Sequence, residues 1–273
     1  MKQRVISGVV LAVFCIAIIF FNYSFPFALN MALALISVCC IYEIMKALSL
    51  LKRWVFLIPS VLISAAVFFV PNREVQFLSY CVYTLLVFLA LLRYHKDVTF
   101  KELAVIYSMA VLIPCALKTL IDLRALSDSH GMFYVIIAVS VAWASDVGAF
   151  FAGTFFGKHK LAPEISPKKT IEGAVGGLIL NILFLLAMGF VFSQVVYGGE
   201  VHSSYLSLFL IGLFGTPISI IGDLSFSLIK RSCRIKDFGQ VIPGHGGLLD
   251  RFDSVIFTAP FVLILCMFLP IVP

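Results

Sequence analysis

The chain has 273 residues, of which 62% are hydrophobic and 12% are charged, and its mean hydropathy is +1.09. Soluble domains are roughly 45–50% apolar and about 25% charged, so this composition excludes an ordinary soluble protein. The formal net charge of +6 is divided among short loops rather than gathered in a basic domain, which argues against nucleic-acid binding.

Long apolar stretches recur along the chain. A transmembrane helix needs about 20 mostly apolar residues, and we expect about nine such spans. They cover approximately residues 5–21, 27–45, 55–70, 76–92, 103–121, 132–153, 171–195, 204–229 and 254–271. The third and fourth stretches are short. The first resembles a signal peptide but lacks a small-residue cleavage site, so we interpret it as a retained helix. The sequence predicts an all-α, polytopic transmembrane helical bundle.

The distribution of positive charge predicts the orientation of this bundle. Lys and Arg accumulate in the cytoplasmic loops of membrane proteins. With the N-terminus inside, 17 of the 20 Lys and Arg residues fall on the inner side. Only Arg73, Lys118 and Arg124 fall on the outer side. We therefore expect the N-terminus and the polar loops to be cytoplasmic, where a basic surface also suits anionic membrane lipids.

The cysteines indicate no disulfide framework. Six of the seven lie in apolar stretches, where they act as small hydrophobic residues. Cys233 lies in a polar loop, and we expect a structural or incidental role for it rather than a reactive one.

Residues 1–130 predict a scaffold of transmembrane helices, and residues 131–273 a catalytic transmembrane part with cytoplasmic polar loops, both within one integral membrane domain. Glu43 is the exceptional charge in the scaffold. It can pair with Lys46 one turn later, which is the favoured interpretation, or contact the polar loops.

The first polar cluster spans residues 143–160 and contains Asp146 within an apolar segment. An ionisable residue at membrane depth costs about 2.5–3.5 kcal/mol, so Asp146 is either functional or one half of a buried pair. Lys158 and Lys160 close the cluster. Small residues at Gly148, Gly153 and Gly157 permit the close approach of a ligand or of another helix.

The second polar cluster, residues 161–177, leads from a basic loop into the next apolar helix. Thr170 is a candidate N-cap of that helix, and Glu172 falls in its first turn, where the helix dipole favours an acid. Lys168 and Lys169 lie beside the helix N-terminus, where they could form a phosphate-binding site. The alternative is that they reflect only the excess of positive charge in cytoplasmic loops. Gly173 and Gly177 form a helix-contact pattern.

The third polar cluster spans residues 223–253. Asp223, Ser227 and Lys230 share one face of a helix, and Asp250 begins the next apolar helix. We expect Asp223 and Asp250 to share a divalent cation, because Mg²⁺ binds one or two carboxylates together with substrate phosphates. The alternative is that these two acids neutralise Lys230 and Arg251 in buried pairs.

The loop between those helices carries further phosphate-type groups, including the backbone at Gly246 and Gly247. His245 lies beside these glycines and either donates a hydrogen bond to phosphate or packs. It has no second His or Cys at ligand spacing, so a transition-metal site is a poor interpretation.

Residues 227–253 resemble the signature of phosphatidate cytidylyltransferases, also called CDP-diacylglycerol synthases, with no departure from it. The run reads Ser227-x-x-Lys230-Arg231-x₄-Lys236-Asp237-x-Gly239-x₂-Ile242-Pro243-x-His245-Gly246-Gly247-x₂-Asp250-Arg251-x-Asp253. The Asp-x-Gly-Ala-aromatic and Ser-Pro-Lys-Lys-Thr-x-Glu-Gly stretches of residues 143–177 are also similar. The N-terminal half matches only in hydropathy and in features such as Tyr42-Glu43, and the length resembles the bacterial form.

The resemblance implies that CTP and phosphatidic acid react to CDP-diacylglycerol and pyrophosphate, with Mg²⁺ and room for a monovalent cation such as K⁺. It implies metal binding by Asp223 and Asp250, a homodimer, and a place in the bacterial inner membrane. The catalytic residues that it implies are Asp223, Lys230, Arg231, Lys236, Asp237, His245, Asp250, Arg251 and Asp253. The substrate-binding residues are Asp146, Lys158, Lys160, Ser166, Lys168, Lys169, Ser227, Gly246 and Gly247.

Two other functions stay open at this point. A CTP-dependent lipid kinase of the polyprenol or phytol type would use similar groups, but the full signature argues against it. A transporter for a phosphorylated solute would line a path through the membrane, whereas these charges gather at one face.

Overall fold

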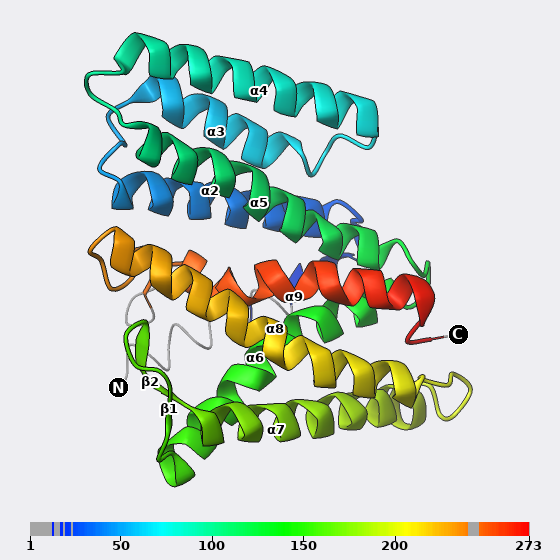
Figure 1. Cartoon of the computed structure of the whole chain (residues 1–273). Coiled ribbons are helices and arrows are strands. Elements are labelled where there is room, and N and C mark those ends of the chain that lie inside the picture. The colour runs from blue at the N-terminus through cyan, green and yellow to red at the C-terminus, as the bar shows by residue number, and fades with distance from the viewer. Residues whose placement is uncertain (1–12, 14–16, 19, 23, 240–245, 273) are drawn as a thin grey trace. The chain divides into compact units, whose positions relative to one another are not determined.

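The computed structural model describes residues 24–239 and 246–272, together with residues 13, 17, 18 and 20–22. The chain forms two compact units (Figure 1). One comprises Met1–Ile121 and Ser232–Phe252, and the other comprises Asp122–Arg231 and Asp253–Pro273. Most of the predicted first span, 5–21, and His245 lie outside the described residues.

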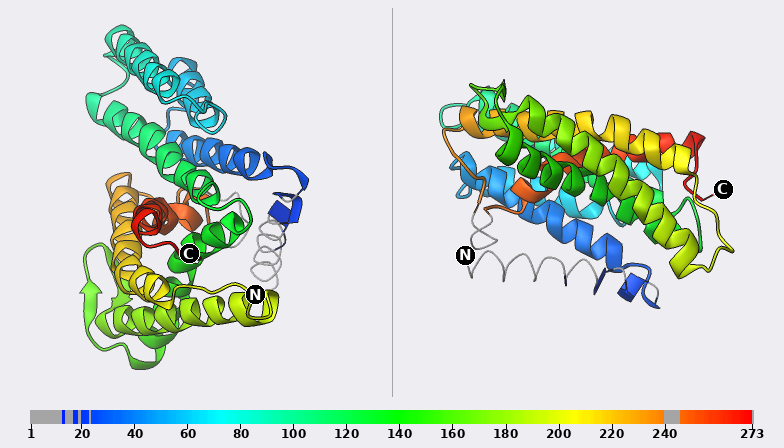
Figure 2. Two further views of the ribbon diagram at one scale, coloured as in Figure 1. Left: turned by 90° about the vertical axis from the view of Figure 1, so that its right-hand side faces the viewer. Right: turned by 90° about the horizontal axis from the view of Figure 1, so that it is seen from below.

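The described part of the first unit contains four apolar helices and the two ends of the segment 232–252. The helices are α2 (Ala28–Ala47), α3 (Trp54–Ala66), α4 (Arg73–Tyr94) and α5 (Phe100–Arg124), the last of which continues into the second unit. Helices α3 and α4 lie side by side (Figures 1 and 2).

Several polar side chains inside this unit form hydrogen bonds, which lower the cost of placing them in apolar surroundings. The Ser60 and Tyr83 hydroxyls lie 3.0 Å apart between α3 and α4. The Tyr83 ring stacks on that of Tyr107 from α5, with 5.7 Å between the ring centroids. The Asn30 amide of α2 donates a 2.7 Å hydrogen bond to the carbonyl of Phe68.

The second unit contains the remaining helices and a short hairpin. Its elements are α6 (Gly131–Phe156), β1 (Lys160–Ala162), β2 (Ser166–Thr170), α7 (Ile171–Phe190), its π-helical extension η1 (Val191–Val196), α8 (Tyr205–Ser232) and α9 (Leu249–Phe268). The first turn of α9 and the last residue of α8 are assigned to the first unit. Asn181 of α7 donates a 2.8 Å hydrogen bond to Thr216 of α8, which joins these two helices through buried polar groups.

Glycines pack α6 directly against α7. A Cβ atom at Gly148 would lie 3.0 Å from the Gly177 Cα, and one at Gly177 would lie 2.8 Å from the Ser145 carbonyl oxygen. A Cβ at Gly173 would lie 2.8 Å from the carbonyl oxygen of Ala149. The small residues therefore allow the close approach of two helices, as in other membrane bundles. Of the two roles expected for Gly148, helix packing is the one that these contacts support.

The all-α, polytopic class is confirmed. Seven described helices are long and apolar enough to cross a membrane: α2, α4, α5, α6, α7 with η1, α8 and α9. Helix α3 is apolar but has 13 residues, so it rises only about 20 Å. The count of about nine spans stays a prediction. The hairpin was not predicted: the structure pairs β1 with β2 antiparallel where the sequence indicated a loop.

Candidate active site

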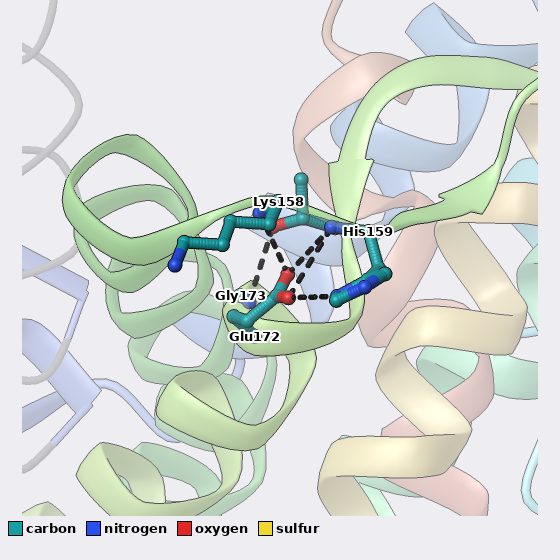
Figure 3. Close-up of polar contacts among 5 residues, drawn as sticks. Lys158, His159, Glu172 and Gly173 are labelled. Carbon is teal, nitrogen blue, oxygen red and sulfur yellow. Dashed lines mark hydrogen bonds and ion pairs between the residues drawn. The ribbon is translucent and has the colours of Figure 1, made fainter.

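The hairpin is held to the start of α7 by the two residues predicted to lie at that helix N-terminus. The Thr170 hydroxyl accepts a 3.1 Å hydrogen bond from the Gly173 N–H, which confirms Thr170 as the N-cap. Figure 3 shows the Glu172 carboxylate facing the backbone of Lys158 and His159. Glu172 also binds the His159 ring nitrogen Nδ1 at 2.6 Å. Glu172 thus fixes the exit of α6 against α7, which is a structural role.

This anchoring leaves the bases of the hairpin region available to a ligand. Lys158, Lys160 and Lys168 are exposed, whereas Lys169 is half-buried. Ser166, at the start of β2, is also half-buried. Two neighbouring lysines of one strand therefore have different surroundings, since successive side chains of a strand point to opposite faces.

Lys169 forms an ion pair with Asp223 of α8, and both side chains are about a quarter exposed, at 24% and 23%. This contact joins the second polar cluster to the third within one compact unit. The sequence predicted both residues as functional but did not predict the pairing. The alternative expectation was that Asp223 neutralises a neighbouring base of its own cluster, and the base that pairs with it comes from the hairpin.

A second acid lies in the same region of this unit. Asp253 of α9 is only 4% exposed and accepts a 2.7 Å hydrogen bond from the Ser254 N–H. It interacts electrostatically with Asp223, Lys230 and Asp146. Lys230 is buried and Asp146 is exposed. Asp253 thus lies within electrostatic range of an acid of α6, an acid of α8 and the buried Lys230.

Ser227 and Arg231 also belong to the second unit, whereas the signature residues from Lys236 to Arg251 belong to the first, where Asp250 binds the backbone on both sides of residues 240–245. Its Oδ2 atom accepts hydrogen bonds from the Phe238 N–H at 3.0 Å and from the Gly247 N–H at 2.9 Å. Gly246 has a φ of +85°, a left-handed conformation that glycine adopts without strain. Asp250 thus joins the two ends of the loop that carries the glycines.

A pocket of about 550 Å³ opens beside the first of those ends. It is lined by Lys46, Ala47, Ser49 and the run Ile235–Gly239. Lys46 and Lys236 are exposed there, as is Asp237. The sequence analysis did not assign Lys46 or Ser49 to the site, because nothing local distinguishes them from other residues at the inner end of a helix.

Glu43 corrects the interpretation that the sequence favoured. Within the part of the chain that the structure describes, it forms no ion pair with Lys46. Its carboxylate instead accepts 2.9 Å hydrogen bonds from the backbone N–H groups of Leu248 and Leu249. The less favoured alternative, contact with a polar loop, is the one that the structure contains.

The acids of the site could supply only some of the ligands of a divalent metal. Within the described residues, no three His, Cys, Asp or Glu side chains are grouped so that they could hold a metal ion. Mg²⁺ needs only one or two carboxylates, because substrate phosphates and water complete its shell. Asp223 already lies against a cation, the Lys169 ammonium, and backbone N–H groups orient Asp250. Each is a single carboxylate, which is the number of protein ligands that Mg²⁺ needs when phosphate and water supply the others.

Cys233 has the surroundings of an unreactive thiol. It is half-buried, and burial raises the pKa of its thiol more than the nearby charge of Lys101 lowers it. The thiolate is the reactive form, so a raised pKa lowers reactivity at neutral pH. The structural or incidental role expected from the sequence stays a prediction.

Comparison with known proteins shows the family to which the chain belongs. A model of the cytidylyltransferase family matches residues 2–269 of the chain. The chain belongs to this family. It is 34% identical to a phosphatidate cytidylyltransferase of Bacillus subtilis over 276 residues, covering 97% of each chain. It is 30% identical to the Haemophilus influenzae protein of that name over 286 residues, covering 96% of each.

A Staphylococcus haemolyticus phosphatidate cytidylyltransferase is 42% identical over 137 residues, which is 50% of each chain. Membership makes this chain an enzyme of the nucleotidyltransferase type, and cytidylyl transfer generally uses a divalent metal. The family resemblance expected from the signature is confirmed, while the roles of individual residues stay predictions.

Proposed function

We propose that the chain transfers the cytidylyl group of CTP to phosphatidic acid, which gives CDP-diacylglycerol and pyrophosphate. The names of its full-length relatives support this reaction. The structural observation that carries the proposal is the ion pair between Lys169 and Asp223. It joins a phosphate-type base from one cluster to a metal-type acid from another, and the reaction needs both kinds of group together.

The reaction requires positioning and charge neutralisation more than a protein nucleophile. A phosphate oxygen of the lipid bonds to the α-phosphorus of CTP while the bond from that phosphorus to the β-phosphate oxygen breaks. The electron pair leaves with pyrophosphate. Asp223 and Asp250 would hold Mg²⁺. A monovalent cation such as K⁺ would bind beside it. The metal supplies neutralisation of phosphate charge.

The bases have complementary roles in this proposal. Phosphate oxygens are bound by Lys230, Arg231, Lys236, His245, Arg251 and the backbone N–H groups of Gly246 and Gly247. Asp146, Lys158, Lys160, Ser166, Lys168, Lys169 and Ser227 close the substrate site from the other clusters. The pocket beside Lys236 supports this assignment, because it opens directly on the signature segment. Asp237 and Asp253 balance the charge of these bases.

The proposal includes where the enzyme works. We place it in the bacterial inner membrane, with the N-terminus and the active-site loops cytoplasmic and with a homodimer as the assembly. The positive-inside distribution of Lys and Arg supports this orientation, and CTP is a cytoplasmic substrate. Residues 1–130 then serve as a scaffold and residues 131–273 as the catalytic part, with the segment 232–252 packed into the first compact unit.

The decisive experiment follows the phosphorus atoms of CTP. Purified protein receives phosphatidic acid, Mg²⁺ and CTP labelled at either the α- or the γ-phosphorus. We expect label in the lipid only from the α position. Label from the γ position would instead identify a lipid kinase. A folded preparation that labels lipid from neither position would favour a transporter.

A further inference from the structure

Glu43 is a buried carboxylate on the scaffold helix α2, and its two oxygens hold the backbone of the signature segment. It is 1% exposed. Oε1 accepts the Leu248 N–H and Oε2 accepts the Leu249 N–H, each at 2.9 Å. Leu249 begins α9, so the carboxylate lies where the helix dipole favours negative charge. A residue about 205 positions earlier in the chain therefore caps this helix.

Two glycines make room for the same carboxylate. A Cβ atom at Gly247 would lie 2.5 Å from the Glu43 Oε2, and one at Gly239 would lie closer still to Oε1. Neither glycine has a positive φ, so space and not backbone conformation requires glycine here. Both ends of the run 239–247 therefore meet at Glu43.

Asp250 is a second carboxylate that binds the backbone of this segment. It binds the backbone of Phe238 and Gly247, and its charge interacts with that of Glu43. A buried carboxylate near a second acid is costly. Among the residues that the structure describes, Glu43 forms no ion pair that would offset this cost. Its hydrogen bonds are those to the segment, and the charge of Lys46, three residues later on α2, interacts favourably with it without forming an ion pair.

We propose that Glu43 is a positioning residue that fixes where residues 236–239 lie relative to residues 246–250. Its carboxylate binds the backbone N–H groups of Leu248 and Leu249 and lies against Gly239, so that Lys236 and Asp237 keep a constant placement relative to Asp250. The catalytic roles of Lys236, Asp237 and Asp250 are those of the proposed function, and this inference rests on them. It adds that the scaffold half of the chain contributes directly to the site.

Glu43→Gln tests the proposal because it preserves the shape of the side chain. Its amide keeps one acceptor but sets an NH₂ group against the second backbone N–H. Supporting groups around metal and phosphate sites typically change activity by about 10- to 100-fold. We expect a loss of this order in kcat/KM for CTP and a higher Mg²⁺ concentration for half-maximal rate. The KM for phosphatidic acid and the circular dichroism spectrum should stay unchanged. Glu74→Gln, at an exposed acid in the first turn of α4, is the matched control.

Hydrogen–deuterium exchange supplies a readout that does not depend on activity. In the wild-type protein the peptide covering residues 246–252 should be protected, and in Glu43→Gln it should exchange at least about tenfold faster. If the wild-type protein fails to form CDP-diacylglycerol, the proposed function fails, and this exchange measurement still tests Glu43.

A second variant approaches the contact from the other side. Gly247→Ala places a methyl group against the carboxylate, so it should produce the same exchange and kinetic changes, and it replaces Glu43→Gln if that variant does not fold. Combining Gly247→Ala with the shorter acid in Glu43→Asp should recover part of the lost protection. Wild-type exchange and kcat/KM in Glu43→Gln would overturn the proposal. So would a uniform loss of thermal stability with unchanged exchange of the 246–252 peptide.

Discussion

The ion pair between Lys169 and Asp223 allows the functional interpretation of the site to be separated from a purely structural one. The perturbation is a set of three variants: Asp223→Asn, Lys169→Gln and the double variant. Each single change leaves one half-buried charge without its partner, and the double change removes both charges. Stability and activity then answer different questions about the same contact.

The expected stability effect follows from the burial of the pair. Exposed ion pairs contribute about 0–1 kcal/mol, and breaking a fully buried pair costs about 3–5 kcal/mol. At 23% and 24% exposure this pair lies between those limits. Each single variant should therefore lose about 2 kcal/mol, and most of this loss should disappear in the double variant. In a chain of this size such a loss lowers Tm by a few degrees.

Activity should not follow stability. If Asp223 serves only to neutralise Lys169, the double variant regains turnover together with its stability. If Asp223 holds the metal, the double variant stays at the level of Asp223→Asn, at least about a hundredfold below wild type. The assay is label transfer from α-labelled CTP over a range of Mg²⁺ concentrations, beside thermal unfolding in detergent. Lys118→Gln, on the predicted outer side, is the control. Near-wild-type turnover of the double variant would refute the metal role of Asp223.

Three further outcomes are expected. In a cysteine-free background, Lys160→Cys and Arg234→Cys should resist a membrane-impermeant maleimide in intact cells and react after lysis, and labelling of both in intact cells would reverse the proposed orientation. Gly177→Ala should cost about 1–3 kcal/mol of stability through overpacking against α6, measured by thermal unfolding, whereas Ile179→Ala on the exposed side of α7 should cost less. Cys233 should react slowly with iodoacetamide at neutral pH and faster as the pH rises, because its raised pKa keeps it a thiol, and Cys233→Ser should retain activity.

Local sequence patterns were sufficient for the helices and for one cap. Long apolar runs have few alternatives in a membrane, because each backbone polar group must be satisfied within its own segment. The predicted spans 132–153 and 204–229 accordingly match α6 and α8 closely. The N-cap at Thr170 was also predictable, since it involves residues three positions apart.

The hairpin of β1 and β2 was not predictable by the same means. Its strands have three and five residues, and Ser166-Pro-Lys-Lys-Thr170 lacks the apolar–polar alternation that identifies a strand. The pairing depends on the anchoring of Lys158 and His159 by Glu172. That anchoring exists only once α6 and α7 have packed through their glycines.

The sequence by itself determined the membrane class, the helices and the chemical types of the site, because these depend on composition and on residues close along the chain. The tertiary structure decided which of those residues meet. Glu43 was expected to contact Lys46, one turn away, yet it binds the backbone of Leu248 and Leu249. Asp223 was expected to share a cation with Asp250 or, as the alternative, to neutralise Lys230, and the ion pair that it forms with Lys169 of the hairpin was in neither expectation. Helical periodicity predicts contacts only between residues within a turn or two of each other. A buried charge, in contrast, binds the donors that the packing of distant segments places beside it.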